Sequence, residues 1–259
     1  MRIEEIIAAV EEDIVFGVLP AQARLVEERI MARFDEKRHV IREVFSRLED
    51  LGLVIRMPNK GAVVNELTPE QVRPIYEMRE LLETNAAIRT LLPVKSSVIK
   101  ELTRIQTLHE EATATENFRA VFRLNIEFHR AQYAACSNPY LVQSIEEYAR
   151  KAHLIRATKY GDAAHMRVVV KQHWAMIKAM GNPDDAKLVE LIRQHLPASP
   201  DEYIRIYKIR YGTTKHDHDA LALVPTIVEA RVTAGWHETR LAGPFIGCAG
   251  VARFSDSGY

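Results

Sequence analysis

The chain has 259 residues, of which 47% are hydrophobic and 27% are charged, and its 35 basic and 35 acidic side chains leave no net charge. This composition indicates a globular protein of one large domain or two ordinary ones, and it excludes attraction of the whole molecule to nucleic acid. Two cysteines exclude a disulfide framework, and we see neither a signal peptide nor an apolar run that could span a bilayer, so we expect a cytoplasmic protein that makes no membrane contact.

Two helices are predicted at the start of the chain, the second of them short. Apolar residues recur at helical spacing through residues 3–14, until Gly17 and Pro20 break the pattern. A second helix is predicted around residues 30–34.

The third helix is predicted over residues 37–53, with the sequence "KRHVIREVFSRLEDLGL". Its apolar residues share one arc of a helical projection, and its basic and polar residues share the opposite arc. The apolar arc holds Val40, Ile41, Val44, Phe45 and Leu48, and the polar arc holds Arg38, His39, Arg42 and Ser46. The first arc predicts burial in a core. The second, at the start of a helix, predicts contact with an anion such as DNA.

A hairpin follows the third helix. The β-like runs "LVIRM" and "GAVV" flank the turn residues Pro58, Asn59 and Gly61. Three helices and a hairpin describe a winged helix-turn-helix, whose third helix enters the major groove of DNA. We therefore expect DNA contacts from Lys37, Arg38, His39, Arg42, Lys60 and Gly61. The alternative is a three-helix scaffold whose arginines are only solvated.

The remainder up to residue 206 has no convincing strand pattern. Capped helix starts are visible at 68–71 and 182–185, and Asn138-Pro139 marks a turn between two helices. Further helices are predicted near residues 97–112, 117–136, 139–160, 164–180 and 183–195. We expect a mostly α protein, with a winged helix-turn-helix over 1–66, an all-α helical bundle over 67–206 and an unassigned extension over 207–259.

Three histidines on separate predicted helices suggest a metal site. His129 lies four residues after Asn125, so both side chains project from one helix face. His173 and His195 lie on two later helices joined by a turn, and antiparallel packing could bring them together. With Asn125 they would form a set of three nitrogens and one oxygen with open positions, which suits Zn²⁺, Ni²⁺ or Mn²⁺. From spacing alone, unrelated core or surface histidines are the alternative.

The N-terminal part resembles the DNA-binding domain of GntR-family bacterial transcription regulators. The resemblance covers about residues 4–65 and includes the "L-x-E" of residues 25–27, the "R-x-x-[VI]-R-E" of 38–43 and the "L-E-x-x-G-L" of 48–53. The wing motif "N-[RK]-G-A" falls on residues 59–62. The resemblance implies that Arg38 and Arg42 are the family's two DNA-contacting arginines, whereas Glu36, Lys37 and His39 depart from the family's pattern.

Three later segments resemble the FCD effector domain of the FadR-like branch of this family: "IYEMRELLETNAA", "NIEFHRAQYAACSNPYL" and "KQHWAMIKAMGNPDDAKLVELIRQHL". The resemblance implies a divalent metal held at Asn125, His129, His173 and His195, with a small carboxylate effector beside it. Asn125 stands where the family has aspartate, which removes one negative charge from the site. Arg156 is a candidate cation for the effector, and a solvated helix arginine is its alternative.

These observations predict a homodimeric transcription regulator that binds a double-stranded operator and is controlled by a small carboxylate. One alternative is a metal-dependent enzyme acting on a small carboxylate, although no motif places a general base beside the histidines. A second alternative is a ligand-responsive regulator without a metal.

Overall fold

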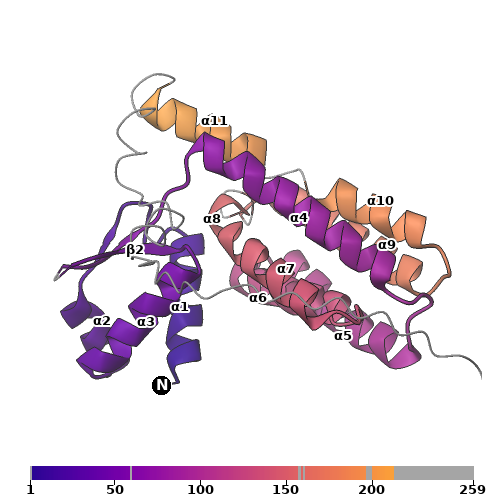
Figure 1. The fold of residues 1–259 in the computed structure, drawn as a ribbon, viewed down its shortest axis with the longest axis horizontal. Coiled ribbons are helices and arrows are strands. Elements are labelled where there is room, and N and C mark those ends of the chain that lie inside the picture. The colour runs from indigo at the N-terminus through magenta and orange to yellow at the C-terminus, as the bar shows by residue number, and fades with distance from the viewer. Residues whose placement is uncertain (1, 59, 157–158, 160, 197–199, 213–259) are drawn as a thin grey trace, which may run out of the picture. The chain divides into compact units, whose positions relative to one another are not determined.

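The computed structural model describes residues 2–212, except residues 59, 157–158, 160 and 197–199 (Figure 1). It confirms the expected mostly α fold, with one small three-stranded sheet. No helix among the described residues is long and apolar enough to cross a membrane. Most of the extension expected over 207–259 lies outside the described residues.

The N-terminal part is a winged helix-turn-helix. Its helices are α1 (Ile3–Val15), α2 (Glu27–Phe34) and α3 (Arg38–Asp50). The wing consists of β2 (Val54–Met57) and β3 (Gly61–Val64), which pair in antiparallel fashion. A short strand that the sequence analysis did not predict, β1 (Arg24–Leu25), pairs with the other edge of β3, so the strand order is β1-β3-β2.

The apolar arc of α3 lies in the core of this part. Ile41, Val44, Phe45 and Leu48 are at most 2% exposed, and they pack with apolar residues of α1 and the sheet. This burial fixes which side of α3 faces the solvent, because the polar arc lies opposite.

Gly61 is required where the wing meets β1. Its φ of +85° is a conformation that side chains rarely adopt. A Cβ atom added there would lie only 2.1 Å from the carbonyl oxygen of Leu25. The glycine therefore allows β1 and β3 to approach each other, which gives it a structural role in addition to the predicted one in DNA contact.

The C-terminal part is a bundle of helices. These are α4 (Pro69–Arg89), α5 (Ser96–Ala114), α6 (Phe118–Tyr133), α7 (Pro139–Lys151), α8 (His153–Arg156), α9 (Ala163–Met180), α10 (Asp185–His195) and α11 (Pro200–Tyr211). Helix α5 packs against α6 and α9, and α4 packs against α7 and α10. Figure 1 shows α4 running beside α10 and α11. A buried apolar cluster that includes Phe128 and Met176 forms the core.

Capping contacts confirm the two predicted capped starts and also show that the turn residue Asn138 caps α7. The Gln71 side chain accepts a hydrogen bond from the Thr68 backbone N–H at 2.9 Å. Asn138 and Asp184 accept from backbone N–H groups at the starts of α7 and α10. Polar residues before an apolar helix therefore located these boundaries correctly.

Two features of the bundle differ from the expectation. The single helix predicted over 139–160 is interrupted after Lys151 by the cap at Ala152, which separates α7 from α8. Helix α11 was not predicted, and the boundary expected at residue 206 falls inside it. The Tyr203 hydroxyl of α11 bonds both the N–H and the C=O of Leu67, at 3.1 and 3.0 Å, so α11 is attached to the start of the bundle.

Helix α8 is also in contact with the winged part. His153 Nδ1 lies 2.6 Å from a carboxylate oxygen of Glu11 on α1, and both residues are buried. Burial opposes ionisation of Glu11, yet the hydrogen bond from His153 holds the pKa of Glu11 below its ordinary 4.5. Burial lowers the pKa of His153. A neutral imidazole thus donates to an ionised carboxylate.

Candidate functional sites

The polar face of α3 is exposed, as the sequence predicts. Lys37 is the N-cap residue, and Arg38, His39 and Arg42 follow on the solvent side. The side chains of Arg38 and Arg42 are 51% and 59% exposed. This face is therefore accessible to a duplex, because only the apolar arc of α3 is buried.

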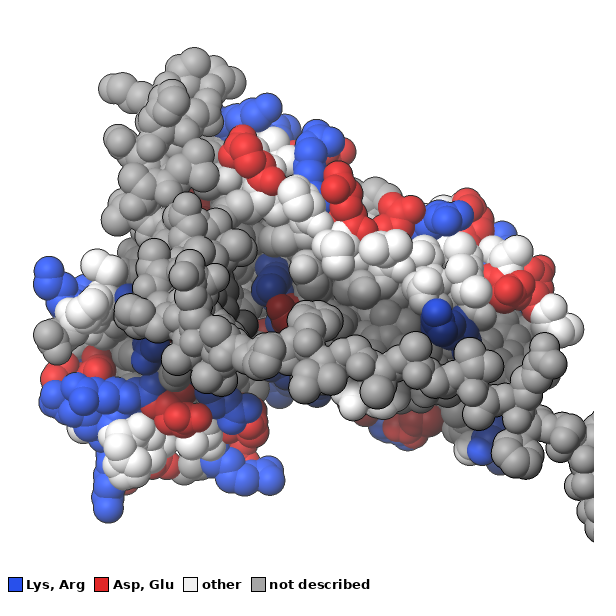
Figure 2. Space-filling view, viewed as in Figure 1, with Lys and Arg blue, Asp and Glu red and all other residues white. Residues whose placement is uncertain are grey.

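Acidic residues of α2 pair with the two arginines. Arg42 Nε lies 3.0 Å from a carboxylate oxygen of Glu27, and Arg38 lies 2.9 Å from Glu28. Figure 2 shows the same mixture of basic and acidic side chains over the winged part. A phosphate group has to compete with these carboxylates, so the pairs weaken indiscriminate attraction to DNA.

The wing presents Lys60 together with Arg24. Both residues are exposed, and the Lys60 carbonyl oxygen accepts a hydrogen bond from Arg24 Nε at 3.1 Å. Arg24 belongs to the unpredicted strand β1, which brings a further cation to the hairpin tip. Arg24 could not be predicted as part of this surface, because nothing near it in the sequence indicates the pairing of β1 with β3.

The fold brings the three predicted histidines together. His129 of α6, His173 of α9 and His195 of α10 offer ring nitrogens within 4.8 Å of one another. Their ring centres are 5.1 Å apart in each pair. Imidazoles on one tetrahedral metal, with metal–nitrogen bonds of about 2.0–2.1 Å, have ring centres about 5 Å apart. The spacing of the three rings therefore fits a shared metal ion.

A glutamine fixes the tautomer of each histidine. The Nδ1 atoms lie 3.0, 2.8 and 2.8 Å from glutamine Oε1 atoms in the pairs His129–Gln132, His173–Gln106 and His195–Gln172. The –NH₂ group of each glutamine donates to a different acceptor. Gln132 donates to the Met176 sulfur, Gln106 to the Val170 carbonyl oxygen, and Gln172 to the Gln194 carbonyl oxygen. The Oε1 atoms thus face the imidazoles, and each Nδ1 carries the proton.

This tautomer leaves a lone pair on every Nε2 atom. His129 Nε2 and His195 Nε2 are 3.2 Å apart, and His173 Nε2 has no hydrogen-bond partner. Two lone pairs at this distance repel each other unless a cation lies between them. Nitrogens bound to one tetrahedral zinc are about 3.3 Å apart. The donor set therefore fits a metal, and its outer contacts resemble those that orient metal-bound histidines.

The three histidines are neutral at physiological pH, which is the form that binds metal. Desolvation, then the charge of Arg156, lowers the pKa of His129 from 6.5 to about 3. Desolvation also lowers the pKa values of His173 and His195 well below 6.5, aided by the neighbouring histidines.

Asn125, the predicted oxygen ligand, lines one small cavity with His195 and another with His129. It is 2% exposed, and its Nδ2 atom has no hydrogen-bond partner. Rotation of the amide by half a turn would place the oxygen where the nitrogen now lies, and an oxygen can bind a metal.

His109 is a further buried histidine, which the sequence did not single out. Neither of its ring nitrogens has a hydrogen-bond partner, and its ring centre lies 5.1 Å from that of His173. It does not belong to the three-histidine set.

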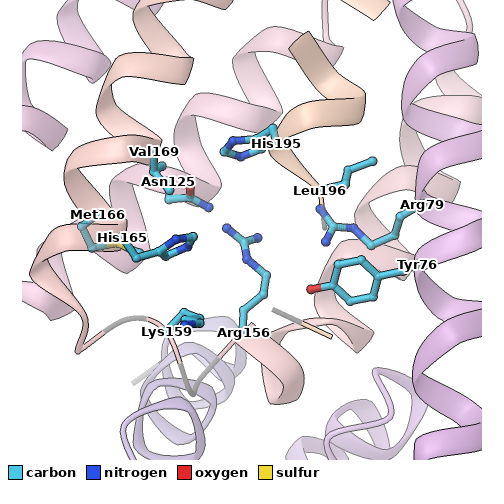
Figure 3. Close-up of a pocket in the computed structure, with 10 residues that line it drawn as sticks. All are labelled: Tyr76, Arg79, Asn125, Arg156, Lys159, His165, Met166, Val169, His195 and Leu196. Atoms are coloured by element: carbon cyan, nitrogen blue, oxygen red, sulfur yellow. The ribbon is translucent and has the colours of Figure 1, made fainter. Parts of the chain in front are cut away.

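Two small cavities of about 30 and 40 Å³ adjoin the cluster. Arg79, Asn125 and Arg156 line both of them, and His195 lines the first and His129 the second. Figure 3 shows Arg156 reaching the middle of the first cavity. Each cavity has room for only a few water molecules, so an organic acid could enter only if side chains moved.

Arg156, the candidate cation for the effector, lines the first cavity together with Arg79 and Tyr76, which the sequence did not indicate. Arg79 is buried and bonds Glu83 at 2.9 Å, and Glu83 accepts a hydrogen bond from the Tyr133 hydroxyl at 2.5 Å. Arg79 and Glu83 are four residues apart in α4, a spacing typical of a helical ion pair, but no sequence signal indicates that the pair faces a cavity.

A winged DNA-binding part joined to a helical part with a candidate ligand site defines a one-component transcriptional regulator. The comparisons agree: residues 2–64 match the model of the bacterial regulatory proteins of the gntR family, and residues 74–198 match that of the FCD domain. The chain belongs to the GntR family and carries an FCD domain. It is a transcriptional regulator and not the enzyme that the sequence analysis kept as an alternative.

Similar proteins include two repressors of Escherichia coli. The transcriptional repressor RspR is 25% identical over 197 residues, which are 74% of this chain and 85% of that protein. The galactonate operon repressor is 28% identical over 187 residues, which are 64% and 78% of the two chains. The structure of E. coli McbR/YncC has the same fold, with a TM-score of 0.65 at 19% identity over 81% of this chain and 98% of that one.

Proposed function

We propose that this regulator acts as a metal-dependent sensor of a small carboxylate in the cytoplasm. The observation that carries the proposal is a set of three histidines that offer ring nitrogens within 4.8 Å of one another, with each Nδ1 held by a glutamine so that the Nε2 lone pairs are left for a metal. When bound, a divalent ion such as Zn²⁺, Ni²⁺ or Mn²⁺ would supply a Lewis-acidic centre that attracts a carboxylate. His129, His173 and His195 would hold it, with Asn125 as the oxygen donor.

The cations at the two cavities support the acidic nature of the effector. Arg156 and Arg79 line both cavities, and Lys159 lines the first. Among the described residues that line the first cavity there is no aspartate or glutamate, so these residues favour an anion. One relative is named for the galactonate operon, which supports the inclusion of sugar acids among the candidates.

The DNA-binding residues would be those on the exposed face of α3 and at the wing: Lys37, Arg38, His39, Arg42, Lys60 and Gly61. In a homodimer, two copies of α3 would enter successive major grooves of a pseudo-palindromic operator. The effector would change operator affinity by binding one arrangement of the dimer more tightly than another.

Metal analysis of the purified protein tests the first part. After dialysis against buffer without chelator, we expect a stoichiometric amount of divalent metal in the wild type and a large loss in His129→Ala. His39→Ala is the matched control, because His39 is exposed on α3 and does not contact the cluster. If the wild type binds no metal even when metal is supplied, the protein is instead the ligand-responsive regulator without a metal.

Effector control is tested by DNA binding of the metal-loaded protein in the presence of a panel of small acids. We expect at least one acid to change the dissociation constant for operator DNA by about 5-fold or more. The same acid should have no effect on a variant in which Arg156 is replaced by methionine. An unchanged dissociation constant with every acid, together with no thermal stabilisation, would contradict the sensor proposal.

A further inference from the structure

The Tyr76 hydroxyl is a buried polar group without a hydrogen-bond partner, and it lines the first cavity. The side chain is 8% exposed, so bulk water does not reach the hydroxyl freely. Figure 3 shows the hydroxyl pointing into the cavity. Unpaired buried hydroxyls are rare in folded proteins, and one aimed into a cavity is explained by a ligand or an ordered water.

Tyr76 has a cationic neighbour on the same helix. Arg79 follows one turn later in α4, and its guanidinium carbon lies 5.1 Å from the centre of the Tyr76 ring. The hydrogen bond to Glu83 fixes this guanidinium. Tyr76 and Arg79 therefore present hydrogen-bond donors from α4, whereas Asn125 and His195 reach the same cavity from α6 and α10 (Figure 3).

We infer that Tyr76 and Arg79 form a second oxygen-binding subsite, so that the effector carries a hydroxyl or a second carboxylate in addition to its first carboxylate. This inference rests on the proposed function, which assigns the first carboxylate to the metal side. An acid that ends in a methyl group would leave the Tyr76 hydroxyl unpaired in the complex. A site built to hydrogen-bond a substituent rejects an analogue that lacks it.

The test compares acids of matched length that differ only in the far end: butyrate, its γ-hydroxy derivative and succinate. Binding to the metal-loaded full chain is measured by calorimetry, and the comparison is repeated with chains shorter and longer by one carbon. We expect the oxygen-bearing acids to bind roughly 10-fold more tightly than the methyl-terminated acid. Preference for succinate over the hydroxy acid would identify the second group as a carboxylate, and the reverse would identify a hydroxyl.

Tyr76→Phe should reduce this preference severalfold, because only Arg79 then remains to bond the second oxygen-bearing group. It should not lower the unfolding temperature of the ligand-free protein, because it removes an unpaired hydroxyl and no hydrogen bond. Loss of selectivity at undiminished stability separates a binding role from a structural one. Tyr140→Phe is the matched control, because Tyr140 is 80% exposed and lies outside both cavities.

Two results would overturn the inference: a methyl-terminated acid that binds as tightly as its oxygen-bearing counterparts, or a Tyr76→Phe variant that keeps the preference in full. In either case the proposed function would stand, because acids would still bind. If no acid of any length binds the wild type, the proposed function itself fails, and this inference fails with it.

Discussion

Replacement of Arg42 by alanine separates DNA contact from folding. The side chain is 59% exposed, and its described ion pair is with Glu27. An exposed ion pair contributes about 0–1 kcal/mol, so the free energy of unfolding should fall by less than about 1 kcal/mol. A bidentate contact with guanine is worth about 1–3 kcal/mol, which corresponds to a loss of roughly 5- to 150-fold in operator affinity.

Arg47→Ala is the matched control for this prediction. Arg47 lies on the same helix, is 40% exposed and pairs with Glu4, so the change in chain and charge is the same. Five positions separate it from Arg42, which places it on another side of α3. It should therefore leave operator affinity close to that of the wild type.

The assay is fluorescence anisotropy with a duplex selected from random DNA by the wild-type protein, over a series of salt concentrations. If Arg42 contacts a phosphate, the variant loses about one unit from the slope of log affinity against log salt, and if it contacts a base, the slope is nearly unchanged. Affinity within about twofold of the wild type, or an equal loss in Arg47→Ala, would refute the placement of Arg42 at the DNA.

Three further predictions concern stability and metal affinity. Gly61→Ala should destabilise the protein by about 2 kcal/mol or more in chemical unfolding, because of the positive φ and the clash with β1, whereas Gly161→Ala meets nothing within 4 Å and should be neutral. Asn125→Asp should raise metal affinity by roughly 10-fold or more in chelator competition, since it adds a charged ligand. Stability should fall below about pH 6.5, where unfolded but not folded His153 takes up a proton, and His153→Gln should flatten this fall.

Each of these predictions has an opposing outcome. Equal unfolding curves for the two glycine variants would show that β1 and β3 can separate without cost. A metal affinity unchanged by Asn125→Asp would remove residue 125 from the ligand set. A pH profile unaffected by His153→Gln would mean that other groups account for the loss of stability.

The Glu11 carboxylate contributes a separate loss of stability at lower pH. Its folded pKa is lowered, so the loss begins below its unfolded pKa of about 4.5.

Periodicity and capping residues predicted most of the fold, because both act within a few residues. The arcs of α3 and the starts of α4, α7 and α10 are examples. Strand β1 was missed because two residues show no alternation, and its pairing with β3 spans more than 35 positions. Helix α11 was missed because Pro200 and Ile204 are its only buried residues, so it shows little of the apolar periodicity by which a helix is predicted.

The histidine cluster was predicted from the sequence only with the help of the resemblance, since spacing alone leaves unrelated histidines as an alternative. Its supporting glutamines were not predicted. Gln172 adjoins His173 in the sequence but bonds His195, so sequence proximity would have assigned it to the wrong ring. Tyr76 and Arg79 share one face of α4, but only the packing of α6, α9 and α10 turns that face into a cavity wall.

Helix α8 spans four residues, His153–Arg156, and its two ends contact different parts of the protein. His153 at one end is hydrogen-bonded to α1, and Arg156 at the other lines both cavities. A single helical turn advances about 5 Å, so His153 and Arg156 lie about one turn apart on the same short helix. If an acid displaced Arg156, the displacement would reach the hydrogen bond to α1 within that one turn, which gives a short route from effector binding to the DNA-binding part.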